Sequence, residues 1–300
     1  KSKFGQSNKA PRQVDGIANP TSIAEYFADH FSRVIGDASG QESDRLRCIY
    51  DEMRPNYCGR PVIDDYAIDA ALVESVINKL DRGKAAGLDE ITAEHLKYCH
   101  PLLPVVLSKL FNLIMKAGHV PANFAKSYTV PILKGHFSAF SKSVNANDFR
   151  GIAISPVISK VFEHCIVDRY CKFLVTSDNQ FGFKKSVGCS HAVFTLRNVV
   201  SYYVSCNSTV NICALDLSKA FDKMNHYGLF IKLMDRQIPV QLLQLLEVWF
   251  RSGLTCVRWG DCFSSFYSQT CGIRQGGVLS PYLFALYIDG VIEKVRRSRV

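Results

Sequence analysis

The residues best suited to chemistry lie at the end of an apolar segment in the last third of the chain. Residues Thr209–Leu215 are predicted to form a buried strand, and Asp216 follows where the backbone leaves the core. The Asp216 carboxylate and the Leu217 carbonyl are hard oxygen ligands of the kind that Mg²⁺ prefers. The alternative for Asp216 is a turn residue at a strand end. For Asp222 the favoured interpretation is an ordinary helix cap or a solvated acid.

A second stretch that could bind a ligand is glycine-rich and precedes a predicted helix. Its glycines, Gly272, Gly276 and Gly277, would let the backbone approach a flat or phosphate-bearing group. The amides at the start of the helix would point outward toward that group. The alternative is a flexible connector between a hairpin and a helix. His226 is interpreted as a hydrogen-bonding residue at a helix start rather than a general base.

The elements that must position these residues mix helices with short strands. An apolar stripe predicts a helix from Ser22, with Ser22 and Glu25 as a capping box. Pro131 suggests an edge position for the first strand. Further helices are predicted at 72–80, 92–117, 156–174, 190–203, 227–236, 240–251 and 281–297, strands at 128–134 and 149–155, a hairpin at 254–269 and a connector at 37–60. Without a strict alternation of strands and helices, the fold class is predicted as α+β.

Composition narrows the choice of partner and compartment. The formal charge of +9 favours a polyanionic partner, although a basic protein without one remains an alternative. The eleven cysteines form no short-spaced pair, so neither a zinc site nor a disulfide framework is predicted. Most are interpreted as small core residues in a reducing compartment. No signal peptide or membrane span is apparent, which predicts an intracellular protein of the cytoplasm or nucleus, without a membrane partner.

Six ordered motifs resemble those of reverse transcriptases from non-LTR (LINE-type) retrotransposons. The runs Ala214–Asp222 and Gly272–Pro281 are similar to the first and second palm motifs of that family. The other four matching runs are residues 83–91, 130–134, 149–154 and 180–184. The resemblance implies a right-hand polymerase with fingers at 61–205 and an incomplete palm at 206–300, in which a fingers excursion separates the two palm motifs. An N-terminal arm and helical extension would occupy residues 1–60.

The resemblance also implies site roles. Asp216 would be the first catalytic, metal-binding carboxylate, assisted by the Leu217 carbonyl, with two Mg²⁺ ions in the complete enzyme. Phe221 would lie beneath the sugar and exclude a 2′-hydroxyl. The other expected dNTP contacts are Lys134, Arg150, Gln275 and Gly276, and the expected template and primer contacts are Arg274, Gln275 and Gly277. Without the motif, Lys134 and Arg150 would be interpreted as solvated surface cations.

The implied activity is RNA-directed DNA synthesis on an RNA template from a DNA primer with dNTPs, with an endonuclease domain expected in the full-length polyprotein. Gly151 and Leu88 depart from the family by replacing prolines, and residues 186–189 lack the usual basic continuation. The third palm motif, an aromatic-x-Asp-Asp turn, is absent, which predicts a truncated chain that is inactive alone. The alternatives are an RNA polymerase or intron-maturase relative, a non-catalytic nucleic-acid-binding remnant, or an unrelated basic scaffold.

Overall fold

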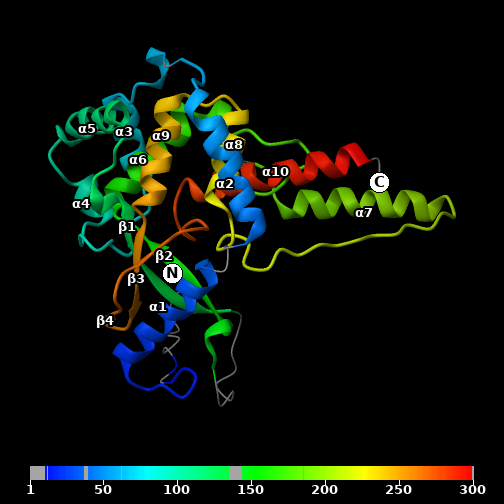
Figure 1. Ribbon diagram of the computed structural model, residues 1–300, viewed down its shortest axis with the longest axis horizontal. Coiled ribbons are helices and arrows are strands. Elements are labelled where there is room, and N and C mark those ends of the chain that lie inside the picture. The colour runs from blue at the N-terminus through cyan, green and yellow to red at the C-terminus, as the bar shows by residue number, and fades with distance from the viewer. Residues whose placement is uncertain are drawn as a thin grey trace.

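The structure is a computed structural model that describes residues 11, 13–36, 40–61, 63–134, 144–184 and 186–298. Helices surround one mixed sheet (Figure 1), so the predicted α+β class is confirmed. The helices are α1 (Pro20–Gly36), α2 (Gln41–Met53), α3 (Ala70–Lys79), α4 (Ala93–Lys97), α5 (Leu103–Ala117), α6 (Val157–Arg169), α7 (Cys189–Ser205), α8 (His226–Asp235), α9 (Val240–Arg251) and α10 (Ser280–Ser298). The strands are β1 (Lys126–Leu133), β2 (Phe149–Ile154), β3 (Leu254–Trp259), β4 (Cys262–Phe263) and β5 (Tyr267–Ser268).

The sheet joins two regions that lie more than a hundred residues apart in the chain. Strand β1 pairs with β2 antiparallel and with β3 parallel, and β4 and β5 both pair with β3. The predicted hairpin about Gly260 is therefore confirmed. Pairing with β3 stops at Thr129, so Pro131 has a partner, Gly151, on one side only. The edge prediction holds at Pro131 and is wrong for the first half of the strand, because proline disrupts pairing only where its own N–H would be needed.

Helix α1 packs on the sheet through an aromatic cluster. The Phe27 ring lies 4.9 Å from that of Phe149 on β2 and 5.4 Å from that of Trp259 on β3. The predicted capping box is wrong, because the Ser22 amide donates to Asn19 Oδ1 at 3.1 Å. Glu25 instead accepts a hydrogen bond from the backbone amide of Ser265 at 2.8 Å. These contacts attach the N-terminal helix firmly to β2 and β3.

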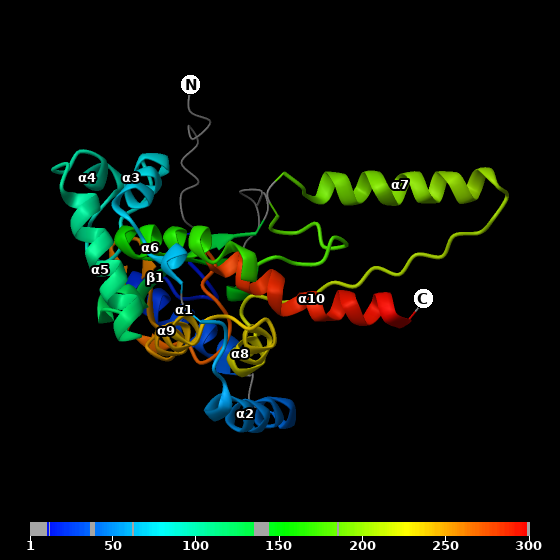
Figure 2. The ribbon, with the colours of Figure 1, turned by 90° about the horizontal axis from the view of Figure 1, so that it is seen from above.

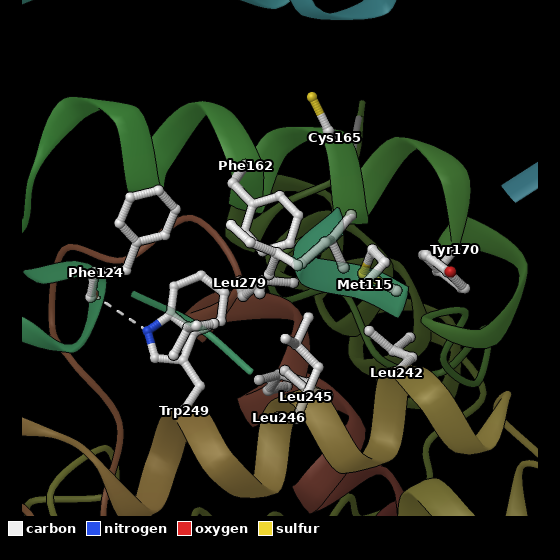
Figure 3. Close-up of a cluster of buried hydrophobic side chains, with 14 of the residues drawn as sticks. Met115, Phe124, Phe162, Cys165, Tyr170, Leu242, Leu245, Leu246, Trp249 and Leu279 are labelled. Carbon is white, nitrogen blue, oxygen red and sulfur yellow. Dashed lines mark hydrogen bonds between the residues drawn. The ribbon is translucent and has the colours of Figure 1, made fainter. Parts of the chain in front are cut away.

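The main hydrophobic core lies between α6 and α9 (Figure 3). The rings of Phe162 on α6 and Trp249 on α9 stack with centroids 5.7 Å apart. The Trp249 indole N–H donates to the Phe124 carbonyl at 3.2 Å, so its buried polar atom is satisfied. Leu279, at the end of the glycine-rich stretch, is buried in the same cluster. The core therefore supports one end of that stretch directly.

Residues 37–60 do not form the predicted connector, since they contain helix α2. Tyr50 of α2 is buried, and its hydroxyl donates to Glu247 on α9 at 2.6 Å. Arg54 donates to both carboxylate oxygens of Glu247, at 2.6 and 3.1 Å. The segment is polar enough to resemble a loop, yet tertiary contacts with α9 hold it as a helix, an outcome that local propensity does not determine.

The predicted buried strand at Thr209–Leu215 is wrong. The segment is extended and exposed, and the Leu215 side chain is 87% accessible to solvent. No hydrogen bond joins residues 209–217 to the rest of the described chain. An apolar run becomes a strand only when another strand satisfies its backbone groups. Helix α7, which precedes it, extends away from the body of the molecule with no buried residue (Figures 1 and 2).

The structure bears on what composition predicted about the cysteines and about membrane spans. All eleven cysteines are free, as expected, but only Cys165, Cys256 and Cys271 are buried, so the prediction that most are core residues is wrong. Within the part of the chain that the structure describes, no helix combines the length and apolar character that crossing a membrane requires.

Candidate active site

The two stretches singled out from the sequence lie against each other as a backbone ladder. The Gly272 amide donates to the Met224 carbonyl at 2.7 Å, and the Ile273 amide donates to the Phe221 carbonyl at 2.9 Å. Gly272 has φ +73°, and a Cβ there would lie 2.6 Å from the Asp222 carbonyl oxygen. Only glycine permits both this conformation and this approach. The first half of the glycine-rich stretch, Gly272 and Ile273, is therefore held tightly against residues 221–224 and is called the strap below. The flexible-connector alternative is wrong for these residues.

Gln275 connects the two stretches through its side chain. Its Nε2 donates to Asp222 Oδ1 at 3.0 Å, while its backbone carbonyl accepts from the Ala153 amide of β2 at 2.7 Å. The next residue, Gly276, has φ +130°, and a Cβ there would lie 2.4 Å from the Ala153 carbonyl oxygen. The backbone of this loop therefore lies directly on the end of β2, and the Gln275 amide is oriented toward Asp222.

Asp222 is neither a helix cap nor a solvated acid, so the favoured interpretation from sequence is wrong. The cap of α8 is Asn225, whose Oδ1 accepts from the Gly228 amide at 3.0 Å. Asp222 is half-buried, and burial raises its pKa, opposed by the hydrogen bond from Gln275 and by the charges of Lys219 and Lys134. The Asp222 carboxylate thus accepts a hydrogen bond from Gln275 and lies in the field of two cations, which favours its ionised form against burial.

His226 occupies the helix start predicted for it. It is the first residue of α8, and its Nε2 lies 2.8 Å from the Gly272 carbonyl. Its ring packs edge-on against Phe250 with centroids 4.7 Å apart. Burial lowers the His226 pKa, which favours the neutral ring. The residue therefore supports the Gly272 strap from behind.

A large cleft opens beside this strap. Its volume is about 740 Å³, and Asp216, Gln275 and Arg150 are among the residues that line it. The structure therefore brings the predicted metal carboxylate, a loop residue and a predicted phosphate-binding residue to one cavity, although no strand delivers Asp216. Other predicted site residues in the lining are Lys134, Leu217, Phe221 and Arg274.

The two predicted phosphate-binding cations, Lys134 and Arg150, are both exposed and differ in how the structure holds them. Lys134 is exposed, and its Nζ donates to the Asn147 carbonyl at 2.8 Å. Arg150 lies on β2, which places its backbone in a fixed position, while its side chain is exposed. A point charge and a guanidinium fork therefore lie on one wall of the cleft, a combination suited to a polyphosphate.

Phe221 is fixed by aromatic neighbours. Its ring stacks on that of Phe284 of α10 with centroids 4.4 Å apart and an interplanar angle of 17°. Phe183 packs edge-on against it at 5.7 Å. A ring held on two sides presents its remaining edge at a constant position, which is what a steric filter in the cleft would need.

Arg274 and Gly277, which were predicted to contact the template and primer, are both partly buried and do not lie on a fully exposed loop. The Arg274 guanidinium donates to the Phe124 and Ala125 carbonyls, at 3.2 and 2.6 Å. Burial lowers its pKa, opposed by the negative charge of Glu163. Gly277 lines a smaller apolar cavity of about 60 Å³, whereas Gly276 is exposed. The guanidinium therefore attaches the loop to the residues that lead into β1.

Residues that sequence reasoning did not assign to this site include two from α1 and one from α6. His30 and Phe31 of α1 line the cleft, and Glu163 of α6 accepts hydrogen bonds from the loop. The apolar stripe containing Phe31 predicted a helix but did not indicate that this helix would line the cleft. Glu163 carried a usable signal, since it is an acidic residue next to the apolar stripe of α6 at Phe162. Buried carboxylates are rare without a partner, so such a residue calls for one.

The donor set for a metal is only partly assembled. Among the described residues, no group of three or more His, Cys, Asp or Glu side chains is arranged to hold a metal ion. Mg²⁺ commonly takes one or two protein carboxylates and completes its shell with water and substrate phosphates. Asp216, whose carboxylate is exposed in the cleft, and the Leu217 carbonyl fit such a partial set.

Comparisons with known proteins agree with these motifs. The chain is 25% identical over 272 residues to the RNA-directed DNA polymerase from mobile element jockey of Drosophila funebris, covering 88% of this chain and 28% of that protein. It is 28% identical over 222 residues to the probable RNA-directed DNA polymerase from transposon X-element of Drosophila melanogaster, covering 72% and 24%. It is 24% identical over 259 residues to the Pol polyprotein from type-2 retrotransposable element R2DM of the same species, covering 82% and 23%.

The chain spans about a quarter of the length of these curated relatives. Residues 137–299, more than half of the chain, match the family described as reverse transcriptase (RNA-dependent DNA polymerase). Enzymes of this family generally use divalent metal ions and act on nucleic acid. The resemblance read from the six motifs is confirmed: this chain belongs to the reverse transcriptase family, among polymerases of non-LTR retrotransposons.

Proposed function

We propose that this chain carries the dNTP- and template-binding part of an RNA-directed DNA polymerase. The observation that carries the proposal is the hydrogen bond from Gln275 to Asp222, which joins the two motifs beside a cleft also lined by Asp216. The full reaction adds dNTPs to a DNA primer 3′-hydroxyl on an RNA template. An endonuclease domain elsewhere in a longer polyprotein belongs to the same proposal.

Within this proposal, residues 61–205 are the fingers and residues 206–300 belong to the palm. The pairing of β3 with β1 supports the excursion by which residues 254–268 return to the fingers sheet. The proposed N-terminal extension, residues 1–60, packs on that sheet through α1 and on α9 through α2. Of these two helices only α1 lines the cleft, through residues that include His30 and Phe31.

Each cleft residue has a proposed role. Asp216 and the Leu217 carbonyl would hold Mg²⁺, which when bound neutralises phosphate charge and polarises the reacting oxygens. Lys134 and Arg150 bind the triphosphate as a point charge and a fork. Phe221, fixed by Phe284, leaves no room for a 2′-hydroxyl and so favours deoxynucleotides.

The loop contributes through its backbone and one side chain. Gln275 and Gly276 lie along the nucleotide and the template strand, because the loop lacks side-chain bulk at Gly276. Gly277 extends the same track for the template and primer. For Arg274 the carbonyl contacts favour a supporting role over a direct contact with nucleic acid.

Binding of an RNA template annealed to a recessed DNA primer tests the proposal. We expect salt-sensitive binding that tightens when Mg²⁺ and the complementary dNTP are added. Because Arg150 is proposed to bind the triphosphate, replacing it with Ala should reduce the tightening by dNTP and leave the Kd measured without dNTP nearly unchanged. Lys116→Ala, on the exposed surface of α5, is the matched control. A primer-template Kd that does not change when the dNTP is added would instead support a non-catalytic, nucleic-acid-binding remnant.

Primer extension tests the second half of the proposal. No aromatic-x-Asp-Asp turn occurs in the 300 residues, so one carboxylate source of the two-metal site is missing from this sequence. We expect no sustained Mg²⁺-dependent synthesis from this chain alone. Clear synthesis would show that Asp216 and Asp222 suffice as the acidic groups, and would overturn the prediction of inactivity.

A further inference from the structure

The end of the glycine-rich loop is held by a buried carboxylate from a different part of the chain. Glu163 lies on α6 and is 5% exposed. Its Oε2 accepts hydrogen bonds from the Val278 amide at 2.7 Å and the Leu279 amide at 2.8 Å. These amides immediately precede α10, which begins at Ser280. One side-chain oxygen thus accepts from two backbone amides, of which the Leu279 amide, directly before the helix, would have no partner within the helix.

The local charges favour an anion at this position. The start of a helix carries partial positive charge, and the Arg274 guanidinium also acts on Glu163. Burial raises the pKa of Glu163, while the two amides and Arg274 oppose that rise by stabilising the ionised form. Arg274 itself is attached to the Phe124 and Ala125 carbonyls. The carboxylate therefore belongs to a buried network that connects α6, the start of β1 and the loop.

The loop also lacks a side chain where it passes this carboxylate. A Cβ at Gly277 would lie 2.6 Å from Ser280 Oγ and 3.4 Å from Glu163 Oε2. The short distance is to the Ser280 hydroxyl, and the distance to Glu163 is an ordinary van der Waals contact. The loop backbone at Gly277 therefore passes directly beside the Glu163 carboxylate.

We infer that Glu163 is a positioning residue: by holding the Val278 and Leu279 amides, it sets where Gln275 lies in the cleft. The other end of the loop is fixed by the Ala153 amide, which donates to the Gln275 carbonyl. With both ends held, the Gln275 amide keeps one orientation toward Asp222. The inference rests on the proposed function, because it assigns Glu163 an effect on nucleotide and template binding.

The test compares two buried glutamates. Glu163→Gln removes the charge from the loop contact, and Glu247→Gln removes the charge from the contact with Tyr50 and Arg54. Amide hydrogen exchange at Val278 and Leu279 and the melting temperature are measured for both. The third measurement is the Kd of the RNA–DNA primer-template with Mg²⁺ and the complementary dNTP. Glu247 is a suitable control because it is similarly buried, at 9% exposed, and lies outside the cleft lining.

We expect Glu163→Gln to speed exchange of the two amides and to raise this Kd, each about tenfold, as for one weakened charged hydrogen bond. Glu247→Gln should lower the melting temperature and leave both other readouts unchanged. Equal Kd changes in the two variants, or an unchanged Kd in Glu163→Gln, would overturn the inference.

Two further experiments distinguish a failure of the inference from a failure of the variant to fold and from a failure of the proposed function. If Glu163→Gln does not fold, Glu163→Asp keeps the charge but shortens the side chain that reaches the two amides, and faster exchange at Val278 and Leu279 is expected. If the unmodified chain does not bind the primer-template, the proposed function fails. In that case exchange at Val278 and Leu279 still decides whether Glu163 holds the loop, and unchanged exchange overturns that too.

Discussion

The two halves of the candidate site differ in how firmly the fold holds them. The loop at 271–281 is attached to β2, to α6 and to the residues before β1, and Leu279 lies in the main core. The segment at 209–217, which carries Asp216, is extended and exposed without a hydrogen bond to other described residues. Both stretches resemble motifs of the same family. The difference teaches that a motif specifies chemistry, whereas its preorganisation comes from whatever packs against it.

The largest effect is expected where the loop meets the core. Trp249→Ala removes the ring stacked on Phe162 and the hydrogen bond to the Phe124 carbonyl. We expect a loss of about 3–5 kcal/mol in the free energy of unfolding, as for other buried aromatic residues. Urea denaturation followed by circular dichroism measures it. A loss below about 1 kcal/mol would mean that the core does not support the loop side of the comparison.

The strap itself should respond next. Gly272→Ala places a Cβ against the Asp222 carbonyl at a positive φ, and it should cost about 3 kcal/mol from strain and overpacking together. Gly260 has φ +60° with no atom within 4 Å of a Cβ, so Gly260→Ala should cost only about 1 kcal/mol of strain. Thermal melting of both variants separates crowding from backbone strain. Equal losses would show that the Gly272–Asp222 approach is not tight.

A pH effect should follow from His226 behind the strap. Burial lowers its pKa below the usual 6.5, so the folded state favours the neutral ring. As pH falls below about 6.5 the unfolded chain binds the proton first, and stability drops until the pH passes the folded-state pKa, by at most about 1.4 kcal/mol per pH unit. His30 and His164, whose pKa values burial also lowers, add to this dependence. The free energy of unfolding of the parent and of His226→Gln is measured by denaturation at pH 5 to 7. The difference between their pH dependences is the contribution of His226, and identical pH dependences would refute the prediction.

The smallest effects are expected in the exposed segment. Leu215→Ala and Asp216→Asn should each change the free energy of unfolding by less than about 0.5 kcal/mol, because exposed side chains without partners contribute little. Asp216→Asn should nevertheless abolish the Mg²⁺-dependent tightening by dNTP. Chemical denaturation and the primer-template titration measure the two properties. A large stability loss at Leu215 would show that the segment is packed in solution and would remove the contrast with the loop.

Much of the fold could be predicted from local patterns. The helices α3, α5, α6, α8, α9 and α10 were all predicted, α3 and α6 from apolar stripes, and Gly118 ends α5 at φ +62° as a glycine cap does. Helix α2 was missed because its apolar content is low and its partner, Glu247, lies 197 residues from Tyr50. The strand at 209–215 was predicted wrongly because a strand depends on a neighbour that no local pattern supplies.

The sequence alone determined which groups are candidates for the chemistry: an acid after an apolar run, two cations, an aromatic ring and a glycine-rich loop in family order. These are properties of side chains and short spacings, so they survive without knowledge of the fold. Only the tertiary structure decided that Asp222 meets Gln275, that α1 lines the cleft and that Glu163 holds a loop 116 residues away. Such contacts depend on how distant segments pack, because burial and hydrogen bonding between them stabilise the fold without leaving a local pattern in the chain.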